Sequence, residues 1–89
     1  MVGAGCVGAN VAYRLAGEGA HVTVLDSGAP GAGTSGASFA WVNSFNKTPR
    51  NYHELNAAGM TEHGRLVEEL GGGSWLKQTG GLSWATGEV

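Results

Sequence analysis

The sequence predicts an α/β fold, and three features of its 89 residues predict it. A glycine-rich turn at residues 3–8 leads into a stretch rich in Ala, Val and Leu, which is typical of a helix. Residues 20–26 then contain the alternating β-branched side chains that favour a strand. A second helical pattern begins near Pro49. Turn, helix and strand in this order are typical of folds whose strands run parallel.

The turn at residues 3–8 reads Gly-Ala-Gly-Cys-Val-Gly, which is a complete GxGxxG motif. In dinucleotide-binding folds of the Rossmann type, its first glycine allows a tight turn and its second lets the backbone approach a pyrophosphate. The third lets helix and strand pack closely. Gly3, Gly5 and Gly8 occupy these positions, and the N–H groups that begin the helix would face the phosphates. A purely structural turn is the alternative, because 17 of the 89 residues are glycine.

An acidic residue accompanies the motif. Asp26 follows Gly8 by 18 residues and ends the predicted strand, where the motif places an acid that binds the ribose hydroxyls of adenosine. A carboxylate there disfavours NADP, because it repels a 2′-phosphate. The alternative role for Asp26 is that of a turn-former before Ser27 and Gly28.

The rest of the chain predicts a loop, a helix and a β-type end. Residues 27–38 are almost all small, which predicts a loop. Thr48-Pro49 marks the start of a long helix, and the glycines at 71–73 end it. Residues 75–85 predict one or two short strands or a hairpin.

Little sequence precedes the motif. Only Met1 and Val2 come before Gly3, so the first strand, normally buried in the centre of the sheet, is expected to be nearly absent. Together with the abrupt end of the pattern at Val89, this leads us to expect a fragment of a longer protein.

Composition excludes several classes of partner. A net charge of −2 without a Lys/Arg cluster gives no footprint for nucleic acid, and no apolar run reaches the roughly 18 residues that span a bilayer. The only basic residue among the first 16 is Arg14, too late for a secretory signal, so a cytoplasmic location is expected. Cys6 is the single cysteine and no Cys/His set has zinc spacing, so neither a disulfide nor a metal site is expected.

Two further landmarks follow the GxGxxG motif and its acid: the GTS sequence within residues 31–43, and the TGGL sequence at residues 79–82. In this order they resemble the N-terminal part of the FAD-dependent amine and D-amino-acid oxidase-like family, which includes glycine oxidase, sarcosine oxidase and D-amino-acid dehydrogenase. The resemblance implies a partial FAD-binding Rossmann-like domain at residues 1–70. It also implies that residues 71–89 begin a β-rich segment, either the first strands of a truncated substrate domain or a β-hairpin.

The family also implies an activity, the oxidation of a small-molecule amine or amino acid by hydride transfer to the flavin of FAD. The motif glycines and the amides of Cys6 and Val7 would hold the pyrophosphate, and Asp26 the adenosine ribose. Three hydroxyl side chains would reach phosphate or ribityl oxygens, unless they bond only to nearby backbone. The implied cofactor-binding residues are Gly3, Gly5, Cys6, Val7, Gly8, Asp26, Thr34, Ser35 and Ser38. The family's substrate-binding residues correspond mostly to positions beyond Val89, so no catalytic residue is identified.

Two other interpretations stay open. An NAD-dependent dehydrogenase would use the same motif and acid, although the GTS and TGGL landmarks count against it. Alternatively, the chain is a non-catalytic fragment or a subunit whose fold a partner chain completes, with Trp75, Leu82 and Trp84 as contact residues.

Overall fold

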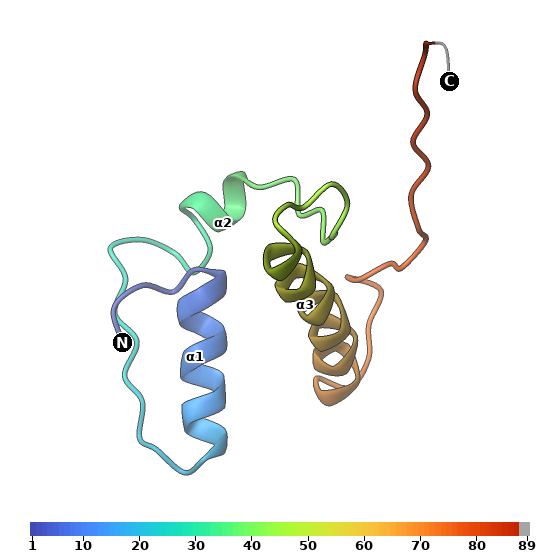
Figure 1. Cartoon of the computed structure of the whole chain (residues 1–89). Coiled ribbons are helices and arrows are strands. Elements are labelled where there is room, and N and C mark those ends of the chain that lie inside the picture. Colours follow the sequence, from blue (N-terminus) through green and yellow to red (C-terminus); the bar gives the residue numbers. More distant parts are fainter. Residues whose placement is uncertain (88–89) are drawn as a thin grey trace. The chain divides into compact units, whose positions relative to one another are not determined.

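The computed structural model describes residues 1–87, and among them it contains three helices (Figure 1). Helix α1 spans Cys6–Gly17, α2 spans Thr34–Ala37 and α3 spans Arg50–Glu69. The chain divides into two compact units, Met1–Trp41 and Val42–Val89. The first unit therefore holds α1 and α2, and the second holds α3.

Helix α1 confirms the helix predicted after the glycine turn. It begins after Gly5 and ends where Gly19 adopts a φ of +88°, a conformation that glycine enters without steric cost. The Gly19 N–H donates to the Ala16 carbonyl and the Ala20 N–H donates to the Leu15 carbonyl, both at 3.0 Å. This pair of bonds is a Schellman cap, which satisfies the last carbonyls of the helix and reverses the chain.

After α1 the chain returns to the helix's N-terminal end and pairs with the first residues (Figure 1). Val2 and Leu25 form a parallel β-bridge, in which the Gly3 N–H donates to the Leu25 carbonyl at 2.7 Å and the Leu25 N–H donates to the Met1 carbonyl at 2.9 Å. Parallel pairing across a helix is the connection of a βαβ unit.

The strand predicted over residues 20–26 does not form as a strand. Within residues 1–87 the Val2–Leu25 bridge is isolated. The Met1 amino group adds one hydrogen bond, to the Thr23 carbonyl at 3.0 Å, and this pairing is too short to form a strand. The structure is helical and does not confirm the α/β class. The Rossmann-like part of that expectation depends on the family described below.

Helix α3 confirms the second helix. Pro49 is its N-cap, as the Thr48-Pro49 pair predicts. At its other end the Gly71 N–H donates to the Glu68 carbonyl at 3.1 Å and the Gly72 N–H to the Val67 carbonyl at 2.7 Å, a second Schellman cap. The glycine run therefore ends the helix, as predicted.

The hairpin expected over residues 75–85 is absent from the described chain, where these residues form neither strand nor bridge. An isolated two-stranded hairpin is marginal in water without a further strand or helix to cover its apolar face. Leu82 and Trp84 are 87% and 81% exposed, so nothing in this structure covers that face. The β-rich segment is not confirmed.

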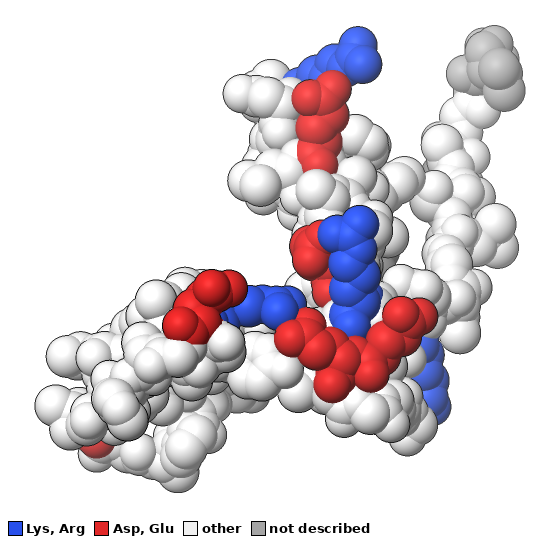
Figure 2. Space-filling model, turned by 90° about the horizontal axis from the view of Figure 1, so that it is seen from below, with Lys and Arg blue, Asp and Glu red and all other residues white. Residues whose placement is uncertain are grey.

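Burial is sparse throughout. Ala12 is the only buried hydrophobic residue among those described, and large side chains such as Val2, Val7 and Phe39 are exposed. On the face shown in Figure 2, acidic and basic side chains lie next to one another within a mostly uncharged surface. No helix within residues 1–87 has the length and apolar character needed to cross a membrane.

Candidate functional site

The GxGxxG turn has the geometry that its glycines predict. Gly3 adopts a φ of +98°, which disfavours any residue with a side chain. A Cβ atom added to Gly8 would lie 2.0 Å from the Gly3 carbonyl oxygen, far inside contact distance. The first glycine therefore permits the turn, and the third permits the close approach of turn and helix.

The start of α1 carries backbone donors. Its first backbone bond runs from the Ala9 N–H to the Gly5 carbonyl at 2.9 Å, and no side chain caps the helix. The N–H groups of Val7 and Gly8 therefore lack an intrahelical acceptor. The Cys6 N–H, expected to face the pyrophosphate, instead donates to the Ser35 Oγ at 2.8 Å.

Asp26 lies beside the turn, because the parallel bridge ends one residue before it. Its Oδ2 accepts the Ala4 N–H at 2.7 Å, and its Oδ1 accepts the Gly28 N–H at 2.9 Å. These bonds from Ala4 and Gly28, with a further one from the Ser27 N–H, hold the pKa of the Asp26 carboxyl below its ordinary value. Both readings of Asp26 thus have a structural basis, since it forms the local turn and also reaches the glycine motif. Each carboxylate oxygen can accept further bonds.

An open depression of about 490 Å³ lies between the glycine turn and the loop that follows Asp26. The residues that line it are Gly5, Asp26, Ser27, Gly28, Gly31, Ala32, Gly33, Thr34 and Ser35. Four of the expected cofactor residues, Gly5, Asp26, Thr34 and Ser35, thus meet around one space.

The other five expected residues do not line this depression. Gly3, Cys6, Val7 and Gly8 belong to the turn and first helical turn beside it. Ser38 lies outside it, and its Oγ accepts the Ala40 N–H at 3.0 Å, which is the local bonding considered as its alternative role.

Sequence reasoning missed Ala4, Gly31 and Gly36. Ala4 donates to Asp26, and its carbonyl accepts the Gly31 N–H at 2.9 Å, so its backbone links three parts of the site. A Cβ atom on Gly36 would lie 2.4 Å from the Gly31 carbonyl oxygen. Their signal was present, because residues 31–36 have the same GxGxxG spacing as residues 3–8.

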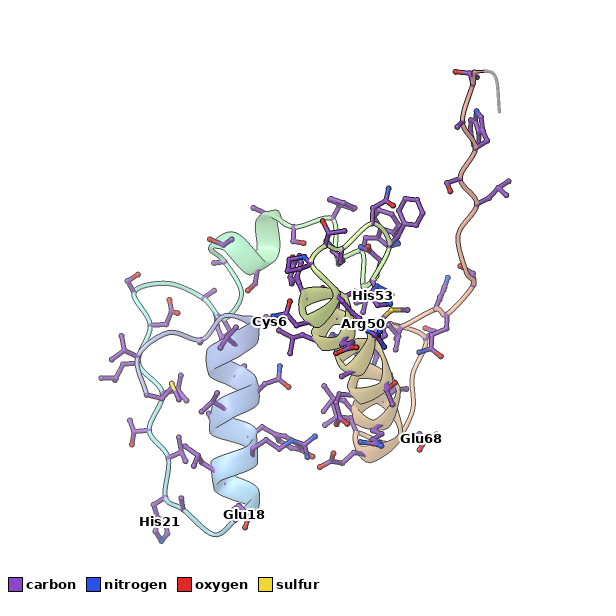
Figure 3. All side chains as sticks on the ribbon, viewed as in Figure 1. Cys6, Glu18, His21, Arg50, His53 and Glu68 are labelled. Carbon is purple, nitrogen blue, oxygen red and sulfur yellow. The ribbon has the colours of Figure 1, made fainter. Side chains whose placement is uncertain are left out.

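The histidines lie outside this site. On α3, the ring Nδ1 of His53 is 2.9 Å from the Ser44 carbonyl, and that of His63 is 2.8 Å from the Gly59 carbonyl. Figure 3 shows Cys6 at the start of α1 and His21 beyond its opposite end. Within the described residues, no group of three or more His, Cys, Asp or Glu side chains is arranged to hold a metal ion.

Comparison with known proteins identifies the family to which this chain belongs. The family described as DAO, FAD dependent oxidoreductase, matches residues 1–89, and the chain belongs to this family. Its cofactor is therefore FAD, and the family acts on small-molecule substrates.

A curated relative agrees. The chain is 34% identical over 73 residues to the uncharacterized oxidoreductase YurR of Bacillus subtilis (strain 168), an alignment that covers 79% of this chain and 19% of the relative. The chain thus spans about a fifth of the length of that relative. No solved structure matches the chain.

The residues present fit the adenosine diphosphate half of FAD. Glycine leaves open space where a side chain would intrude: a Cβ on Gly5 would come within 3.1 Å of the Ser35 Oγ, at the wall of the depression. Asp26 supplies acceptors at the wall of the depression, and the Val7 and Gly8 N–H groups in the first turn of α1 are donors beside it. Donors for an anion and acceptors for a diol are the groups that this half of the cofactor requires.

Proposed function

We propose that this chain forms the part of an FAD-dependent oxidoreductase that holds the adenosine diphosphate half of the cofactor. The carrying observation is the parallel bridge between Val2 and Leu25, which brings the glycine turn and Asp26 together. Two segments that lie 22 residues apart in sequence are joined by the bond from Ala4 to Asp26.

Each group has a defined task in this proposal. The first-turn N–H groups of α1 and the positive end of its dipole stabilise the pyrophosphate. Asp26, kept ionised by its N–H donors, accepts hydrogen bonds from the ribose hydroxyls. Thr34 supplies a hydroxyl at the rim of the depression. When bound, FAD supplies the redox chemistry by accepting a hydride at its flavin ring.

The substrate class that we propose is an amine or amino acid. Support comes from the family and from the order of the GTS and TGGL landmarks, which resemble amine and amino-acid oxidases. We further propose that residues 1–70 belong to the FAD-binding domain and residues 71–89 to the start of the substrate domain, in a cytoplasmic enzyme.

The proposal includes further polypeptide that covers this chain, from the same protein or from a partner. The support for this part of the proposal is the scarcity of buried residues, because Ala12 is the only hydrophobic residue that is buried among those described. Soluble proteins seldom leave this many large apolar side chains open to water. Size measurement of the protein from its source cells tests this: a particle no larger than the 89-residue chain would contradict it.

FAD titration of the deflavinated protein, followed by flavin fluorescence, tests the site. Replacing Asp26 by Ala removes the ribose acceptors and should weaken FAD binding about tenfold or more. This is the effect expected from the loss of one or two hydrogen bonds to a charged group. Glu18→Gln is the matched control, because Glu18 is an exposed acid at the opposite end of α1 from Cys6 (Figure 3). Equal affinity in the Asp26 variant and the wild type would contradict the ribose role.

A further inference from the structure

We draw no further inference here: the strongest candidate, the exposed aromatic patch that Phe39 and Trp41 form just after α2 with ring centroids 6.4 Å apart, carries none because nothing within residues 1–87 shows what covers it.

Discussion

Replacing Gly8 by Ala should weaken FAD binding although alanine is the better helix former. The new Cβ would lie 2.0 Å from the Gly3 carbonyl oxygen, while Cβ atoms keep at least 3.0 Å from such atoms, so turn and helix must separate by about 1 Å. Overpacking of this kind costs about 1–3 kcal/mol, more than the 0.5–1 kcal/mol or so that alanine gains in a helix. If the pyrophosphate binds as proposed, a shift of that size would lengthen each hydrogen bond from a backbone N–H to a pyrophosphate oxygen beyond hydrogen-bonding range.

The measurement is an FAD titration by flavin fluorescence, paired with thermal unfolding followed by circular dichroism. We expect FAD to bind at least tenfold more weakly, which is about 1.4 kcal/mol, together with a lower midpoint of unfolding. Gly17→Ala is the matched control in the same helix, because a Cβ on Gly17 meets no atom within 4 Å, and it should keep the affinity of the wild type. A Gly8→Ala protein with unchanged affinity and midpoint would refute the role of this contact.

Three further predictions concern pH and stability. The pKa of Asp26 is lower in the folded than in the unfolded protein, so its contribution to stability is complete above about pH 4 and is lost as the pH falls through the folded pKa. The difference in unfolding free energy between the wild type and Asp26→Asn, measured in denaturant titrations, should therefore shrink only below about pH 4. Gly59→Ala in α3, where no atom lies within 4 Å of the added Cβ, should raise the free energy of unfolding by about 0.5–1 kcal/mol. Gly72→Ala, at a φ of +81°, should lower the free energy of unfolding by about 1–2 kcal/mol. Urea titration measures both changes, and a more stable Gly72→Ala protein would contradict the role of Gly72 in the helix cap. Removing the Arg50–Glu54 ion pair by Glu54→Ala should change the free energy of unfolding by less than about 0.5 kcal/mol, because the two side chains are 90% and 58% exposed. A decrease in the free energy of unfolding of more than about 1 kcal/mol would contradict a surface ion pair.

The long helices could be predicted because their signals are local. Pro49 and the glycines at 71–73 bound α3 in the sequence, and Gly19 provides the cap of α1. Such caps depend on backbone conformation within a few residues, which the residue type controls directly.

The strands could not be predicted in the same way. Residues 20–26 have β-type side chains, but a strand exists only through hydrogen bonds to another segment. Met1 and Gly3 bond to this segment at Thr23 and Leu25 alone, within the residues that the structure describes. The segment 75–85 likewise has the residue types of a hairpin without a partner that covers Trp84.

At the candidate site, the motif indicated the three glycines of the first turn and Asp26, and the structure brings them together. Helix α2 was missed because small residues are typical of loops, although its sequence repeats that of the first turn. The bond from Cys6 to Ser35 joins distant segments, and only the folded chain reveals it.

The most direct test of the proposed cofactor site is a structure of the protein with FAD bound. We expect pyrophosphate oxygens within about 3.2 Å of the Val7 and Gly8 N–H groups, and ribose hydroxyls at the same distance from the Asp26 carboxylate. An adenosine diphosphate bound elsewhere, with the glycine turn and Asp26 free of the cofactor, would contradict it.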